Sequence, residues 1–212
     1  MAVPVENRRY TVREYLDLEA KALDKHEYDN GEILAMAGCT LEHDKVNRNL
    51  YTELGARLKG SPCSFHTSNM RIRLDRSGRY VYPDATIVCG EARFDSDDPN
   101  RTTITNPRIV FEILSETTEA YDRGNKFEAY RTLDSFQMYV LISQVRPIVE
   151  TFTRVDDGTW IFAAYHHASA VAKLPVIGID LPLQDLYTGV QFPELLPPPP
   201  EESGEPQVPR RN

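Results

Sequence analysis

The stretch FEILSETTEAYDRGNKFEAY, residues 111–130, decides how this chain folds, because it begins as a predicted β-strand and ends as a predicted helix. The apolar run over residues 109–114 is interrupted only by Glu112. Side chains alternate between the two faces of a strand, so Glu112 shares a face with Val110 and Leu114. Because both faces are apolar, we expect this strand to be central in its sheet, with a carboxylate inside it.

A second acid follows in the stretch YVYPDATIVC, residues 80–89. Pro83 has no N–H for a sheet ladder, so the strand is expected to begin beside Asp84. Burying an unpaired carboxylate such as Glu112 is unfavourable, and two acids on neighbouring strands repel each other. A divalent cation held between Asp84 and Glu112 is the simplest compensation, and Mg²⁺ binds through one or two carboxylates plus waters.

Lys126 lies on the helix predicted over residues 123–133, for which Asp122 is the predicted N-cap. Tyr130 follows at i+4 on the same face. A lysine at this position is able to reach back over the end of the Glu112 strand and neutralise charge on a phosphate or orient an attacking water. A solvated lysine, or a helix partner of Asp122, is the alternative interpretation.

The other candidates also have ordinary structural explanations. Asp84 after a proline is typical of a turn or cap acid. Glu27, just before the Asn30-Gly31 turn, is typical of an exposed strand, and a lone His43 on a helix is more often structurally satisfied than catalytic. Spacing alone therefore makes a metal-dependent site plausible without deciding it.

Composition sets the remaining bounds. The chain has 212 residues with a formal net charge of −8 and three cysteines, Cys39, Cys63 and Cys89. Widely spaced cysteines without a CxxC pair indicate free, mostly buried thiols, and the first ten residues lack the apolar core of a secretory signal. We therefore expect a cytoplasmic protein, without a membrane-spanning segment because no apolar run is long enough.

Helical and strand periodicities alternate along the chain. A helix after residue 11, a hairpin over residues 26–36 and a long helix capped by Thr40 precede several strands, and further helix and strand segments follow. This order predicts an α/β or α+β fold with a mixed sheet flanked by helices. The domain is expected over residues 8–192, and the Pro- and Glu-rich residues 193–212 are expected to form a flexible tail.

The negative net charge argues against non-specific coating of nucleic acid. Four arginines lie close together in the sequence: Arg71, Arg73, Arg76 and Arg79. They have two equally weighted interpretations, a local basic stripe near the Asp84 strand and a solvated hairpin without a ligand. Arg71 and Arg73 alternate with apolar residues, which suits a half-exposed strand.

Several motifs, taken in order, resemble a known family: HEYDNGEILAMAG from residue 26, YPDATIVCG from residue 82, IVFEILSETTEAYDRGNKFEAYR from residue 109 and QMYVLIS from residue 137. Over about residues 8–190 the chain is similar to the Uma-two-like restriction endonucleases, formerly a domain of unknown function, of the PD-(D/E)XK nuclease superfamily. The resemblance implies a restriction-endonuclease-like core, in which a mixed central sheet is flanked by helices.

The resemblance also implies site residues. Pro83-Asp84 matches the PD element and Glu112 the second acid, while Leu114 stands where the superfamily has its lysine. In this family the lysine lies on the following helix, at the place of Lys126. Glu27 and His43 match an early acid and a helix histidine. Ser115-Glu116 replaces the family's Ser-Pro and adds a charge at the mouth of the site.

The expected function is that of an endonuclease, an enzyme that uses Mg²⁺, or alternatively Mn²⁺, to hydrolyse phosphodiester bonds of DNA. RNA is an alternative substrate. The competing hypothesis is a catalytically inactive nuclease fold that acts as a binding or assembly module, which the charge of −8 favours. The resemblance allows a homodimer, although the sequence carries no dimerisation signature.

Overall fold

The computed structural model describes residues 8–36, 38–74, 78–156 and 158–193. Its main sheet has six strands in the order β11-β10-β9-β8-β6-β3. Their bounds, in that order, are Trp160–His166, Ile148–Arg154, Met138–Ser143, Ile109–Leu114, Ala85–Cys89 and Cys63–Thr67. Strand β8 carries Glu112 and is interior to the sheet, with all six of its residues buried, as the sequence predicts.

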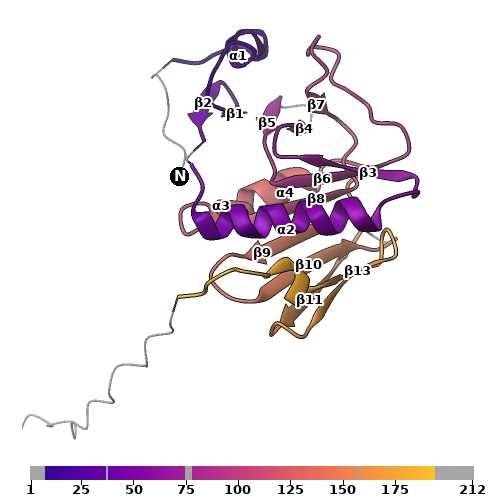
Figure 1. The fold of residues 1–212 in the computed structure, drawn as a ribbon. Helices are drawn as coiled ribbons and strands as arrows, with labels where there is room; N and C mark the ends of the chain where they lie inside the picture. The colour runs from indigo at the N-terminus through magenta and orange to yellow at the C-terminus, as the bar shows by residue number, and fades with distance from the viewer. Residues whose placement is uncertain (1–7, 37, 75–77, 157, 194–212) are drawn as a thin grey trace, which may run out of the picture.

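The main sheet is mixed and covered on both faces. Strands β8 and β9 run parallel, whereas β6 pairs with β8 in the antiparallel sense. Helix α2 (Leu41–Arg57) crosses one face, and a helical segment over residues 119–130 lies on the other (Figure 1). This arrangement confirms the predicted α+β class.

The two faces of β8 contribute to two separate apolar cores. Ile109, Phe111 and Ile113 pack in the core under α2, together with Leu50 of that helix. Val110 and Leu114 pack instead with Ala129 and Tyr130. Glu112 follows the alternation and faces this second core, so the carboxylate must find its partners under the segment 119–130.

Helix α2 forms because its local sequence meets the requirements of a helix at both its start and its buried face. The hydroxyl of Thr40 accepts a hydrogen bond from the N–H of His43, so Thr40 is the N-cap. Val46, Leu50 and Leu54 recur at helical spacing and are fully buried. This stripe fixes the rotation of α2, and with it the direction in which His43 points.

A second, five-stranded sheet packs beside the main one, in the order β2-β1-β5-β4-β7. Their bounds, in that order, are Glu32–Ala35, His26–Asp29, Arg79–Val81, Arg71–Leu74 and Thr103–Ile104. Helix α1 (Val12–Glu19) starts with the expected capping box of Thr11 and Glu14. Asn30 and Gly31 both have positive φ, which is the backbone that a two-residue hairpin turn needs.

The segment that carries Lys126 differs from the predicted helix over residues 123–133. It begins as α3 (Glu119–Tyr121), continues as a π-helical turn η1 (Asp122–Lys126) and ends as α4 (Phe127–Tyr130). The prediction of Asp122 as N-cap is wrong, because this residue lies inside the helical segment and is buried with Lys126. Its carboxylate pairs with the Lys126 ammonium at 3.5 Å instead of capping a backbone N–H.

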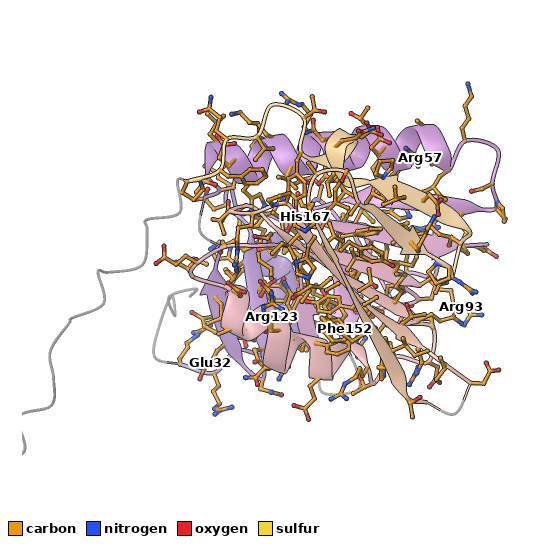
Figure 2. The ribbon with its side chains drawn as sticks, turned by 90° about the horizontal axis from the view of Figure 1, so that it is seen from below. Glu32, Arg57, Arg93, Arg123, Phe152 and His167 are labelled. Atoms are coloured by element: carbon orange, nitrogen blue, oxygen red, sulfur yellow. A yellow bond between two sulfur atoms is a disulfide. The ribbon has the colours of Figure 1, made fainter. Side chains whose placement is uncertain are left out.

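The remaining elements pack on the face of the main sheet that α2 covers. Strands β12 (Val171–Leu174) and β13 (Ile179–Pro182) form a two-stranded sheet, followed by helix α5 (Leu183–Leu186), which adds to the core under α2. Phe152 of β10 packs against Phe127 of α4 at 4.9 Å between ring centres, and Figure 2 shows it on the sheet. Among the helices of the described residues, none has the length and apolar character that a membrane crossing needs.

Two of the three cysteines are not free thiols. Cys63 and Cys89 are register partners on the antiparallel strands β3 and β6, and their sulfur atoms form a disulfide. Cys39 is free and exposed. The expectation of three free, mostly buried thiols is therefore wrong, because a separation of 26 residues does not reveal that two strands pair in this register.

We expect one titratable thiol per chain when the protein is denatured without reductant, and three after reduction. Reduction should also lower the free energy of unfolding by roughly 3 kcal/mol, since the bond closes a loop of moderate length in the unfolded chain. A thiol-reactive chromophore and denaturant titrations with and without reductant measure the two quantities.

The Cys39→Ser variant is the matched control, because it should leave no titratable thiol before reduction. Three reactive thiols in the unreduced wild-type protein would contradict the disulfide.

The predicted flexible tail falls almost entirely outside the described residues, which end at residue 193. The predicted domain bounds of 8–192 stay a prediction.

Candidate functional site

The buried Glu112 is paired with the ammonium of Lys126. Lys126 Nζ lies 2.9 Å from Glu112 Oε1, and the hydroxyl of Tyr130 donates a hydrogen bond to the same oxygen at 3.1 Å. Glu112 is 4% exposed and Lys126 is 5% exposed. The lysine is therefore an inward-pointing residue, and the interpretation of Lys126 as a solvated helix residue is wrong.

Two more carboxylates surround Lys126. Asp122 Oδ1 lies 3.5 Å from its Nζ, and so does Oε1 of Glu27, which comes from β1 in the second sheet. The N–H of Tyr82 also donates to Glu27 Oε1 at 3.0 Å. Glu27 is buried, so it is not the exposed strand acid that its position before a hairpin turn suggests.

Asp84 sits at the mouth of strand β6, beside the same cluster. The register of β6 with β8 pairs Ala85 with Phe111, so one step further places Asp84 level with Glu112. One carboxylate oxygen, Oδ2, accepts a hydrogen bond from the N–H of Ile113 at 2.7 Å. The two acids predicted from sequence thus lie side by side on adjoining strands.

The other oxygen of Asp84 is bound from the opposite layer. His43 of α2 has its Nε2 atom 3.0 Å from Asp84 Oδ1. Tyr51, two helical turns further along α2, donates its hydroxyl to the backbone carbonyl of Asp84 at 2.8 Å. Asp84 therefore joins the layer of α2 to the layer of Lys126.

The electrostatics of the cluster show an excess of negative charge. Burial raises the pKa of Glu112 well above its usual range; Lys126 opposes this rise, while Asp122 and Asp84 add to it. Burial alone would lower the pKa of Lys126, but Glu112, Glu27 and Asp122 outweigh it and hold this pKa well above the ordinary value. Three carboxylates, those of Glu112, Glu27 and Asp122, contact one ammonium, so the lysine stays protonated and the cluster keeps an excess of negative charge.

The pKa of His43 is also affected by this charge. Burial of the imidazole favours its neutral form, but the hydrogen bond and the charge of Asp84, with smaller contributions from Asp44 and Asp122, raise the pKa above its ordinary value. With a proton on Nε2, His43 donates to Asp84 and orients that carboxylate.

The donor set fits a hydrated divalent cation better than a closed metal cage. Within the described residues no three or more His, Cys, Asp or Glu side chains converge as ready ligands. Mg²⁺ and Mn²⁺ bind oxygen donors, and Mg²⁺ is commonly held by one or two carboxylates, with waters completing its shell. Asp84 and Glu112 supply two such carboxylates, already held by protein donors: His43 and the N–H of Ile113 for Asp84, and Lys126 and Tyr130 for Glu112. They are oxygen ligands of the kind and number that Mg²⁺ takes.

Three of the four arginines proposed as a basic stripe, Arg71, Arg73 and Arg79, are ion-pair partners of carboxylates within the fold. Arg71 is 4% exposed and its guanidinium lies 3.0 Å from Asp98, while Arg73 pairs with Asp95 at 2.6 Å. Arg79 pairs with Asp29 at 2.9 Å. The expectation of a half-exposed strand at Arg71 is wrong, because Asp98, from the connection between β6 and β7, pairs with its buried guanidinium. Asp95 of the same connection pairs with Arg73 and Asp29 of β1 pairs with Arg79, so neither a basic stripe nor a solvated hairpin describes these three residues. Arg76 lies outside the described residues.

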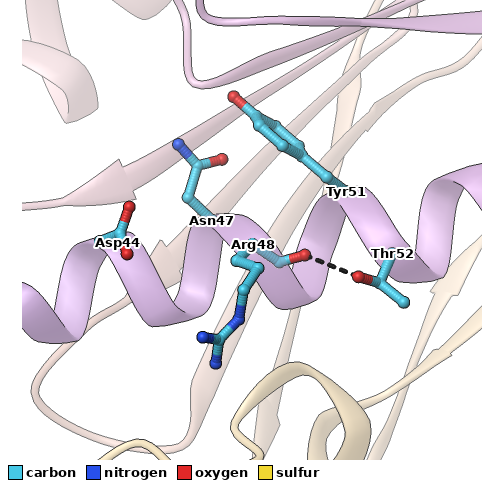
Figure 3. A pocket seen from close by; sticks show the side chains of 5 residues that line it. All are labelled: Asp44, Asn47, Arg48, Tyr51 and Thr52. Carbon is cyan, nitrogen blue, oxygen red and sulfur yellow. Dashed lines mark hydrogen bonds between the residues drawn. The ribbon is translucent and has the colours of Figure 1, made fainter.

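Sequence reasoning missed two residues near the cluster. Lys25 precedes β1 by one residue and shares the face of Glu27, a period-two signal that was available. Tyr51 follows His43 at i+8, so it lies on the same flank of α2. Figure 3 shows this flank with Asn47 beside Tyr51, and the helix surface there lines a hollow of about 390 Å³. The buried Asn47 Oδ1 has no hydrogen-bond partner among the described residues.

The main sheet is mixed and covered by helices on both faces, with acids at two adjoining strands and a lysine on the helical segment that follows. The family model Uma2, described as "Putative restriction endonuclease", matches residues 12–184. The chain belongs to this family, which confirms the resemblance stated from the sequence.

Two relatives and one solved structure are similar to this chain. The uncharacterized protein slr1290 of Synechocystis sp. is 34% identical over 180 residues, covering 84% of this chain and 92% of the relative. A second uncharacterized Synechocystis protein, sll1609, is 32% identical over 161 residues, covering 76% and 90%. A crystal structure from Anabaena variabilis, described as a "putative nuclease belonging to DUF820", superposes with a TM-score of 0.68 at 16% identity, over 84% of this chain and 98% of that one.

We expect Lys126→Met to lower the free energy of unfolding by about 3 kcal/mol or more, because it leaves Glu112 buried without its cation. The double variant Lys126→Met/Glu112→Gln should lose less than the sum of the two single variants. Denaturant titrations of the four proteins measure the coupling.

Lys45→Met is the matched control, since Lys45 pairs with Glu42 near the surface of α2. It should change stability little. Additive effects of Lys126→Met and Glu112→Gln would contradict the energetic coupling of this pair.

Proposed function

We propose that this chain is a Mg²⁺-dependent endonuclease that hydrolyses phosphodiester bonds of DNA. One observation carries the proposal: Asp84, just before β6, lies level with Glu112 of β8, while Lys126 contacts Glu112 from the helical segment that follows. Membership of the Uma2 family supports the same function. RNA is the alternative substrate, and Mn²⁺ is the alternative ion.

In this proposal Asp84 and Glu112 are the residues that hold the ion. Bound there, Mg²⁺ supplies stabilisation of the charge that develops at phosphorus and lowers the pKa of a bound water. Hydrolysis joins the oxygen of a water to phosphorus and breaks one P–O ester bond. The attacking water gives up a proton to solvent, and the leaving oxygen takes up a proton from solvent. Lys126, which its acidic neighbours keep protonated, donates a hydrogen bond to a phosphate oxygen or to the attacking water.

The other site residues have supporting roles. Tyr130 donates to Glu112 Oε1, so it shares this oxygen with Lys126 and fixes the carboxylate. Glu27 and Asp122 hold the Lys126 ammonium from two sides. His43 orients Asp84 through their 3.0 Å contact. We propose that Glu27 and His43 act by positioning these groups.

We expect the wild-type protein to nick supercoiled plasmid in Mg²⁺ or Mn²⁺ and to lose this activity when the metal is chelated. Asp84→Asn, Glu112→Gln and Lys126→Met should each reduce the rate by roughly 100-fold or more, as expected for loss of a group that stabilises transition-state charge. Gel densitometry of plasmid forms over time measures the rates.

The control is Asp180→Asn, an exposed acid on β13 that pairs with Lys173 far from the cluster in the fold. It should retain the wild-type rate. Nicking that survives chelation, or that persists in Asp84→Asn, would count against the proposal.

A binding or assembly module is the second candidate. It is favoured by the charge of −8 and by the internal pairing of Arg71, Arg73 and Arg79, which removes the expected basic stripe. Normal Mn²⁺ binding by calorimetry, with no cleavage of DNA or RNA, would support the module. A homodimer and a cytoplasmic location stay predictions.

A further inference from the structure

Lys25 is a partly buried cation beside the site for which the proposed mechanism has no use. It comes directly before strand β1, and the N–H of Met36 fixes its backbone by donating to the Lys25 carbonyl at 3.0 Å. Glu27, two residues further along, contacts the Lys126 ammonium, so the backbone at Lys25 lies beside the acidic cluster.

The ammonium of Lys25 is held close to Asp84 by a chain of hydrogen bonds. Its Nζ donates to the Ser68 carbonyl at 2.8 Å and lies 3.4 Å from Ser68 Oγ. The N–H of Ser68 donates to the Tyr51 hydroxyl at 3.0 Å, and that hydroxyl donates to the Asp84 carbonyl at 2.8 Å. Both Asp84 and Glu19 act electrostatically on the ammonium, against the effect of burial, which lowers the pKa of Lys25.

Lys25 also differs from the other partly buried cations near the site. Lys126, Arg71, Arg73 and Arg79 each contact a carboxylate within 3.0 Å. Lys25 forms no ion pair within the part of the chain that the structure describes, and its two acceptors come from one uncharged serine. An ammonium has three N–H donors and is strongly hydrated, so a half-buried one without an anion is suited to bind an anion from outside.

We propose that Lys25 binds a phosphate of the nucleic-acid strand at the α2 side of the site, while Lys126 acts from the other face of β8. This inference rests on the proposed function and adds a substrate contact to it. The neighbouring Ser68 turn and the ring of Tyr82, 5.5 Å from the Lys25 ammonium, hold the side chain in place for that contact.

The test is the salt dependence of binding to a short fluorescent DNA duplex, measured by anisotropy in Ca²⁺. Each phosphate contact adds about 0.9 to the slope of log K against log salt concentration. Lys25→Gln removes one such contact, so it should reduce the magnitude of this slope by about 0.9 and weaken binding several-fold at low salt. Lys25→Arg should keep the wild-type slope, because it keeps the charge.

Lys59→Gln is the matched control. It removes the same charge from an exposed residue just beyond the C-terminal end of α2, and it should leave the slope unchanged. Thermal unfolding of each variant measures the structural contribution of the bond to Ser68. Lower stability of Lys25→Gln with an unchanged slope would overturn this inference alone, whereas a wild-type protein that binds no nucleic acid would overturn the proposed function as well.

Discussion

The contact between Lys126 and Glu112 is the constraint on which the rest of the site depends. A carboxylate in the interior of a fully covered sheet is unstable alone, and the ammonium at 2.9 Å makes it tolerable. One cation does not neutralise the three acids that contact it, and Asp84 lies beside them. The fold therefore stores an excess of negative charge at one end of its central strands, where an added cation is favourable.

The π-helical turn η1 is the local backbone feature that serves this contact. It spans residues 122–126, so both the acid at its start and the lysine at its end belong to the same turn and are buried. A π turn carries one more residue than a regular helical turn and is frequent at functional sites. Here it lets Asp122 and Lys126 face the sheet together, beside Tyr130 of the following turn.

Charge is distributed unevenly over the molecule. In the second sheet Arg71 and Arg73 pair with acids of the connection between β6 and β7, and Arg79 pairs with Asp29, so their charge stabilises the fold and is not displayed to a polyanion. Nucleic acid would then be bound by a few local contacts against an overall negative charge, and such binding is strongly salt-dependent. This division makes the placement of single cations around Asp84 more important than the net charge.

Sequence by itself determined the fold class, the central strand and the caps of helices α1 and α2, and it predicted that Asp84, Glu112 and Lys126 lie together, while their role in a site stays a prediction. These are properties of local periodicity, capping chemistry and motif order, which short windows of sequence contain. The tertiary structure alone decided that Glu27 joins Lys126, that Arg71 is buried against Asp98, and that Cys63 meets Cys89. The two partners of each of these pairs lie far apart in the sequence, and the local sequence around one partner does not indicate the other. The pairings depend on strand order, on register and on the rotation of a helix over a sheet.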